Sequence, residues 1–264
     1  MGKYGSESHR NWGHSNTFGK DDTMLAERLQ RAGFHTLSAH ALPYFGRGTG
    51  LERGFEKIDL SAVPSEGSLK EMENSVTGDR LTSAALKLLA MPEHTGKRFF
   101  FWMHFLDPHA DYLRHEDGPS FGTSQRDLYD GEITYWDEQF GHLVAELRRR
   151  NIYDNTLIVI TSDHGMPFPR VKGQIYEDGY HLPLAMRWGK GIKPGRVVED
   201  FINVRDLAPT YLELAGVPLH EQMTGKSLVN ILRSEKSGFI EDRKVMLAGK
   251  ERHDMGRPND WGYP

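Results

Sequence analysis

The chain has 264 residues, 38% of them hydrophobic, which is enough for one large or two modest domains with a sizeable core. Its 33 Lys and Arg against 37 Asp and Glu give a formal net charge of -4, which provides no general attraction to nucleic acid or to an anionic membrane. The complete absence of cysteine excludes disulfides, thiolate metal sites and a cysteine nucleophile from these residues.

The N-terminal segment, residues 1–20, is polar and rich in Gly, Ser and His. It has no apolar region of the kind that secretory signals carry, and no part of the chain reaches the ~20 apolar residues of a membrane-spanning helix. We expect residues 1–20 to form a polar leader, with disorder as one option.

Segments with helix and strand patterns alternate along the first half of the chain. The expected elements are a helix over residues 24–32 capped by Asp22 or Thr23, a strand over residues 34–41, and a helix from Thr77 or Asp79 to Leu89. The apolar run Phe99–Met103 is typical of a strand buried on both faces, and it leads directly into a polar cluster that ends at His109.

The second half continues this alternation. Residues 129–150 predict a helix with one apolar face, and the acids Asp137, Glu138 and Glu146 fall largely off that face. The run Leu157–Ile160 again predicts a strand buried on both faces, followed by Ser162-Asp163-His164-Gly165. A strand over residues 182–188 and a helix capped by Asn203 and ending at Gly216 complete the series. Together these elements predict an α/β domain with a largely parallel sheet.

Polar groups at strand ends or in adjoining loops form one candidate site, because α/β sheets bind ligands beyond the carboxyl ends of their strands. Asp163 and His164 suit a divalent cation, although Ca²⁺ and Mg²⁺ favour an oxygen-rich shell. Lys172 suits a tetrahedral anion, and His109 can donate a proton to a leaving oxygen or nitrogen near neutral pH. These groups are the parts of a metal-assisted phosphoryl or sulfuryl transfer site. Taken singly, each also has a simpler reading: a turn histidine, a capped strand end and a solvated lysine.

Several motifs follow one another in a characteristic order: residues 99–109, Tyr129-Asp130-Gly131-Glu132-Ile133, residues 154–156, residues 161–165, Tyr176-Glu177-Asp178-Gly179, Pro183-Leu184 and residues 206–218. In this order they resemble the sulfatases of the alkaline phosphatase superfamily, over most of the chain from about Thr23. The resemblance implies a three-layer α/β sandwich with a largely parallel central sheet flanked by helices. It also implies a partial sulfatase-type core over residues 21–240 and the start of a C-terminal subdomain over residues 241–264.

The resemblance also implies roles for single residues. Asp163 and His164 match calcium ligands, with Mg²⁺ as the other option, Lys172 matches the lysine that contacts the sulfate, and His109 matches the histidine that protonates the leaving group. Residues 249–253 and 262–264 resemble the heparan N-sulfatase (sulfamidase) branch, which implies substrate contacts at Glu251, Arg252 and His253. The implied substrate is a sulfate ester or N-sulfate, of a glycan or another small molecule. Members of this family are often exported.

Parts of the family pattern are missing from these residues. There is no Cys, and no Ser stands in the Ser-x-Pro-x-Arg motif that would supply a formylglycine nucleophile. No early strand ends in two Asp residues, and residues 38–43 replace the expected Gly-Lys-x-x-His segment. Without the nucleophile covalent catalysis is lost, so we expect the chain to be inactive alone.

Three hypotheses therefore stay open. The first is a sulfatase that uses a divalent cation. The second is a non-catalytic remnant that binds sulfated glycans or a partner chain. The third is a phosphate or phosphonate ester hydrolase of the same superfamily, for which Ser15, Thr17 and Thr23 are the early candidates for a hydroxyl nucleophile. The identity of the sulfated substrate, the compartment and the oligomeric state stay open as well.

Overall fold

The computed structural model describes residue 18 and residues 21–46, 48–65, 75–109, 112–115, 118–165 and 176–246. The chain divides into two compact units, which we name the 23–151 unit (Thr23–Asn151) and the 152–264 unit (Ile152–Pro264 with Met1–Asp22). Within the described residues, no helix has both the length and the apolar character needed to span a bilayer.

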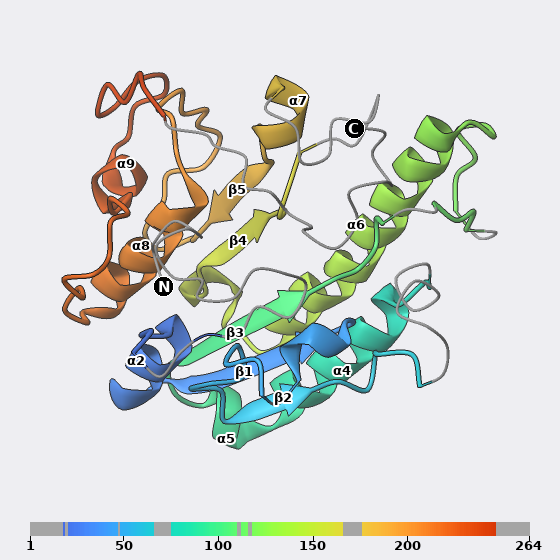
Figure 1. Ribbon diagram of the computed structural model, residues 1–264, viewed down its shortest axis with the longest axis horizontal. Helices are drawn as coiled ribbons and strands as arrows, with labels where there is room; N and C mark the ends of the chain where they lie inside the picture. The colour runs from blue at the N-terminus through green and yellow to red at the C-terminus, as the bar shows by residue number, and fades with distance from the viewer. Residues whose placement is uncertain are drawn as a thin grey trace, which may run out of the picture. The chain divides into compact units, whose positions relative to one another are not determined.

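The 23–151 unit is built on a parallel three-stranded sheet of order β2–β1–β3 (Figure 1). The strands are β1 (His35–His40), β2 (Lys57–Asp59) and β3 (Phe99–His104). In the register of β1 and β3, His35 lies opposite Phe99 and His40 lies opposite His104. The carboxyl ends of the two strands therefore lie side by side at the same end of the sheet. The expected strands at residues 34–41 and 99–103 are confirmed. The expectation that the second strand is buried on both faces is wrong, because Phe99 to His104 are all half-buried.

Helices pack against this sheet, and the hydrophobic core of the unit lies between them and the sheet. The helix α4 (Gly78–Ala90) packs against β1, and the long helix α6 (Gln125–Arg149) packs along α4. Leu81 and Leu88 of α4 are buried with Ala39 of β1 and with Leu106, just beyond β3. The unit also contains the short elements α2 (Leu25–Arg31), η1 (Pro43–Phe45) and α5 (Pro92–Thr95). The apolar spacing that predicted the second helix thus corresponds to its buried face.

Two helix starts differ from the sequence-based expectation. The cap of α2 is Met24 rather than Asp22 or Thr23, and the Glu27 carboxylate accepts the Met24 backbone N–H at 3.1 Å. The helix α6 begins four residues before residue 129. Ser124 accepts the Asp127 N–H at 3.2 Å while the Asp127 carboxylate accepts the Ser124 N–H at 2.9 Å. An apolar stripe cannot locate such a polar first turn.

The 152–264 unit contains a two-stranded sheet of β4 (Ile158–Thr161) and β5 (Leu184–Arg187). These strands are antiparallel, with Ile158 opposite Arg187 and Thr161 opposite Leu184. The expectation of a strand buried on both faces is wrong for this run, because Ile158 to Ile160 are half-buried and Thr161 is exposed. A short apolar run indicates a strand but carries no information on the direction of its partner. The helical elements of the unit are η2 (Tyr153–Asn155), α7 (Glu177–Tyr180), η3 (Val204–Asp206), α8 (Leu207–Ala215) and α9 (Val229–Arg233).

The start and end of α8 follow the predicted capping signals. The Asn203 side chain accepts the Arg205 N–H at 3.1 Å, and the Asp206 carboxylate accepts the Asn203 N–H at 3.0 Å. Gly216 ends the helix in the left-handed conformation, with φ 72°. The short turn η3 precedes α8, so the capped segment begins as a 3₁₀ turn.

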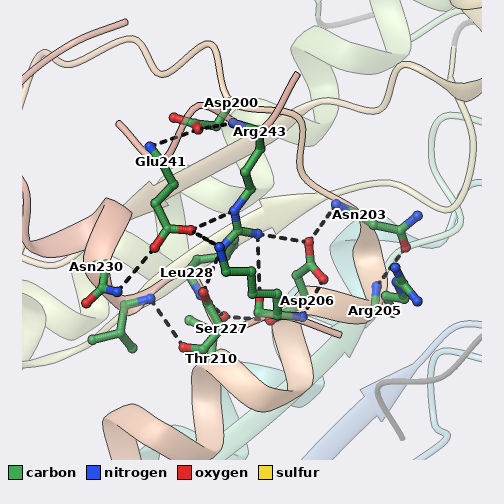
Figure 2. Close-up of polar contacts among 12 residues, drawn as sticks. Asp200, Asn203, Arg205, Asp206, Thr210, Ser227, Leu228, Asn230, Glu241 and Arg243 are labelled. Atoms are coloured by element: carbon green, nitrogen blue, oxygen red, sulfur yellow. Dashed lines mark hydrogen bonds and ion pairs between the residues drawn. The ribbon is translucent and has the colours of Figure 1, made fainter. Parts of the chain in front are cut away.

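A polar cluster, shown in Figure 2, joins residues 240–243 to the start of α8. The Asp200 carboxylate accepts backbone N–H groups from Ile240 at 2.6 Å, Glu241 at 3.0 Å and Arg243 at 2.9 Å. The Arg243 guanidinium pairs with Glu241 at 2.7 Å and with Asp206 at 3.4 Å. Because only 10% of the Arg243 side chain is exposed, these bonds lie in a mostly dehydrated setting.

Candidate functional site

The residues that the sequence singled out fall into three groups. His109 lies in the 23–151 unit, and Asp163 and His164 lie in the 152–264 unit. Lys172, Glu251, Arg252 and His253 lie outside the described residues. The surroundings of three candidates are therefore visible, and the roles predicted for all seven remain predictions.

Asp163 and His164 stand in a turn directly after β4. The Ser162 hydroxyl donates to the His164 carbonyl at 2.7 Å, and the Gly165 N–H donates to the Gly179 carbonyl at 2.9 Å. A Cβ at Gly165 would overlap the Asp178 carbonyl, so this close approach of two chain segments requires glycine. The sequence after β4 thus fixes the turn that presents the two side chains.

Asp163 and His164 suit two ligands of a divalent cation. His164 Nδ1 lies 2.8 Å from the Gly165 carbonyl oxygen, which can only accept, so Nδ1 carries a proton and Nε2 of the neutral ring keeps its lone pair. Nε2 lies 3.7 Å from Asp163 Oδ1, and the Asp163 side chain is 75% exposed. A backbone carbonyl that holds the other ring nitrogen is a common feature of metal-ligating histidines.

The pair does not form a complete calcium site. Calcium takes about six to eight oxygen ligands. In the part of the chain that the structure describes, no three His, Asp or Glu side chains are placed to hold a metal ion together. The described residues therefore contain no complete metal site, and the assignment of Asp163 and His164 as metal ligands remains a prediction.

His109 is held by its backbone after β3. Its N–H donates to Glu132 Oε2 at 3.2 Å, and the Leu113 N–H donates to Glu132 Oε1 at 2.8 Å. Glu132 projects from α6 and is only 2% exposed. One buried carboxylate of α6 thus binds two points of the segment that follows β3.

Further polar contacts secure this segment before and after His109. The Asp107 carboxylate, also buried, accepts the Thr77 N–H at 3.2 Å and the Thr77 hydroxyl at 2.9 Å, at the start of α4. The His115 ring stacks on Tyr135 of α6 with ring centroids 4.0 Å apart, and its Nε2 lies 4.0 Å from Glu132 Oε1. Burial raises the pKa of Asp107 and lowers that of His115.

The histidines at the ends of β1 and β3 have a packing role. His40 is 2% exposed and stacks on Phe45 with centroids 4.1 Å apart, and His104 lies 4.8 Å from the same ring. Burial, followed by the charge of His104, lowers the pKa of His40 to about 3, so its ring is neutral near pH 7.

The sulfatase family model matches residues 3–217. The chain belongs to the sulfatase family. It is 32% identical to arylsulfatase K of Canis lupus familiaris over 135 residues, which is 48% of this chain and 25% of the relative. It is 26% identical to the uncharacterized sulfatase YdeN of Escherichia coli K12 over 230 residues, 78% of this chain and 40% of the relative. The chain thus spans well under half the length of these curated sulfatases.

Solved structures show that this sulfatase chain has the expected fold. BT4656, solved with its substrate D-glucosamine-2-N,6-O-disulfate, has a TM-score of 0.72 at 18% identity, covering 92% of this chain and 70% of that chain. The phosphonate monoester hydrolase SpPMH from Silicibacter pomeroyi has a TM-score of 0.65 at 23% identity, covering 88% of this chain and 65% of that chain. The predicted α/β fold of the alkaline phosphatase type is confirmed.

Sequence reasoning missed the role of Glu132 in this sulfatase chain. In the sequence, Glu132 is recognised only as a residue of the motif Tyr129–Ile133. The helical pattern places its neighbour Ile133 on the apolar face. In the structure Ile133 is 41% exposed, whereas Glu132 is buried on the same face as Gln139 and Leu143. The helical spacing of 132, 139 and 143 is the signal that could have placed Glu132 inside.

Proposed function

We propose that this chain is the part of a sulfatase that binds and protonates the sulfated substrate, a sulfate ester or N-sulfate of a sugar. The proposal is carried by the family match over residues 3–217, which includes His109, Asp163, His164 and Lys172. The disulfated glucosamine bound by the structural neighbour BT4656 supports a sulfated amino sugar as the substrate class.

Each candidate residue has a proposed task. Asp163 and His164 would hold a divalent cation, Ca²⁺ first and Mg²⁺ second, which when bound would offset the negative charge of the sulfate. Lys172 would contact a sulfate oxygen, and Glu251, Arg252 and His253 would contact the sugar. His109 would donate a proton to the leaving oxygen or nitrogen, because departure without that proton leaves a high-energy anion.

A non-catalytic binding function is the second candidate, and one observation favours it. The 264 residues contain neither Cys nor a Ser-x-Pro-x-Arg motif. A covalent step through formylglycine therefore needs a group that this sequence does not contain. The residues that would bind a sulfated sugar do not depend on that group.

The test combines binding and turnover on the purified chain. We expect calorimetry to detect Ca²⁺ binding that Asp163→Asn abolishes and Asp137→Asn, at an exposed acid of α6, leaves unchanged. We expect N-sulfoglucosamine to bind, with affinity reduced by His109→Ala but not by His142→Ala, an exposed histidine of α6.

Turnover separates the hypotheses. Sulfate release from N-sulfoglucosamine or 4-nitrophenyl sulfate supports the hydrolase, and ligand binding without release supports the non-catalytic function. Hydrolysis of a phenylphosphonate ester that is faster than hydrolysis of either sulfated compound supports a phosphate or phosphonate ester hydrolase. The proposal would be overturned if the chain did not bind Ca²⁺, or if it did not bind the sulfated sugar.

A further inference from the structure

Glu132 occupies an unusual position for a carboxylate. It lies within the 25-residue helix α6, it is 2% exposed, and it receives two backbone N–H groups from a non-helical segment. A buried carboxylate is unfavourable unless hydrogen bonds or a counter-charge stabilise it. The N–H groups of His109 and Leu113 therefore stabilise the buried carboxylate of Glu132.

The groups that face Glu132 give it little opposite charge. His115 is its ion-pair partner among the described residues, at 4.0 Å, and burial lowers the pKa of that imidazole. Asp107, three residues beyond β3, and Tyr112 also interact with Glu132 electrostatically, and neither offers a positive charge. The hold of Glu132 on the chain therefore depends on hydrogen bonds from the backbone.

We propose that Glu132 is a positioning residue for His109. Its carboxylate binds the backbone N–H groups of His109 and Leu113 and so sets where the His109 imidazole lies, and it weakens this hold when it takes up a proton. The proposal rests on the proposed function, in which His109 protonates the leaving group.

The chemistry of the carboxyl group supports a pH-dependent hold. An ionised carboxylate accepts strong hydrogen bonds at both oxygens, whereas a neutral carboxyl has one hydroxyl oxygen, a weaker acceptor. Burial, reinforced by the charge of Asp107, raises the pKa of Glu132 to about 7, although the N–H groups of Leu113 and His109 act in the opposite direction. The change of state therefore falls near neutral pH.

Hydrogen exchange by NMR on the full chain tests the proposal. After correction for intrinsic rates, we expect protection of the His109 and Leu113 amides against local opening, in which these N–H groups leave Glu132 while its carboxyl stays buried, to rise about tenfold from pH 6 to pH 8, as charge-assisted bonds replace neutral ones. The ¹³C signal of the Glu132 carboxyl should titrate with the same midpoint. In Glu132→Gln the protection should lose its pH dependence, and the His109 ring signals should shift.

The control variant is Glu138→Gln, an exposed position on the same helix, which should behave like the unmodified chain. Protection that is independent of pH in the unmodified chain, or that keeps its pH dependence in Glu132→Gln, would overturn the proposal. The titration of the unmodified chain decides the question even if Glu132→Gln does not fold. None of these measurements requires turnover, so failure of the sulfatase assays and failure of this proposal are separate results.

Discussion

Asp107 and Glu132 are both buried carboxylates of the 23–151 unit, but they are bound differently. Asp107 accepts the backbone N–H and the hydroxyl of Thr77, whereas Glu132 accepts N–H groups from two backbone positions four residues apart. Burial raises the pKa of both groups. The free energy needed to ionise either carboxyl group is therefore higher in the folded chain than in the unfolded chain.

This cost gives a prediction for stability against pH. Because the folded pKa of Glu132, about 7, lies above its ordinary value of 4.5, the folded chain holds more protons between these values. Its contribution to stability is present below pH 4.5 and is lost as the pH rises to about 7. A shift of this size corresponds to about 3 kcal/mol. The stability of Glu132→Gln relative to the unmodified chain, measured by urea unfolding, should therefore rise by about that much from pH 4 to pH 8, on top of a pH-independent cost for replacing one acceptor oxygen by an N–H₂ group.

The control for this measurement is Glu138→Gln, whose carboxylate is exposed on α6. Its stability should follow the pH curve of the unmodified chain. Parallel pH curves for the Glu132→Gln variant and the unmodified chain would show that Glu132 ionises without cost, contrary to the prediction.

Asp200 predicts the opposite pH dependence. Burial acts to raise its pKa, but three backbone N–H groups and the charge of Arg243 outweigh burial and lower it below the ordinary 3.8. Its contribution to stability is therefore present above pH 3.8 and is lost as the pH falls through the lowered folded value. Asp200→Asn replaces one acceptor oxygen by an N–H₂ group that faces N–H donors, and should cost roughly 1–3 kcal/mol at pH 7.

Thermal unfolding at pH 7 and pH 3 measures this effect. The loss in Asp200→Asn should shrink at pH 3, because below the ordinary pKa of 3.8 the unfolded chain takes up a proton that the folded carboxylate, with its lowered pKa, resists. Asp242→Asn is the matched control, since 67% of the Asp242 side chain is exposed. An equal loss in the two variants at pH 7 would contradict a special role for Asp200.

At the scale of elements, the end of α8 and the loop after it use glycine for two different reasons. Gly216 has φ 72°, and a Cβ at this position would meet no heavy atom within 4 Å, so its requirement is conformational. A Cβ at Gly225 would instead overlap the Arg205 carbonyl, so its requirement is steric. Conformation and space can thus be tested separately in one unit.

We predict that Gly216→Ala destabilises the chain by about 1 kcal/mol, the cost of a left-handed alanine. Gly225→Ala should cost clearly more, because the backbone of two segments must move apart. Urea unfolding of the two variants compares them directly. Equal midpoints would show that the contact between Gly225 and Arg205 relaxes without cost.

The sequence predicted those elements whose signal is local. In each case the residues that carry the signal lie close together in the sequence. Examples are the apolar face of α4, the apolar runs of β1 and β3, and the capping pair Asn203 and Asp206. The antiparallel pairing of β4 with β5 was not predictable, since the partner lies more than twenty residues away. The same reason explains Glu132, whose partners His109 and Leu113 precede it by 23 and 19 residues.

The candidate site was predicted in kind rather than in detail. Asp163, His164 and His109 were recognised because each follows an apolar strand, and the structure confirms that β4 and β3 end just before them. Glu132, which holds His109, was not recognised, because it binds backbone N–H groups, and every residue except proline carries such a group.

At the scale of the whole molecule, each unit has a core of its own. The 23–151 core contains Leu81, and the 152–264 core is built around Leu207, Leu228 and Ile231. Leu212 of α8 is also fully buried. A chain divided in this way is expected to open in separate cooperative parts rather than as one.

Two matched core variants test this division. Leu81→Ala and Leu212→Ala each remove the same atoms from a fully buried site, and each should cost roughly 2–5 kcal/mol. If each unit opens by itself, Leu81→Ala raises hydrogen exchange in β1, β3 and α4 while α8 and α9 keep their protection, and Leu212→Ala does the reverse. Exchange measured by mass spectrometry at fixed pH distinguishes the two patterns. A loss of protection throughout the chain in both variants would instead mean that the two cores fold as one cooperative unit.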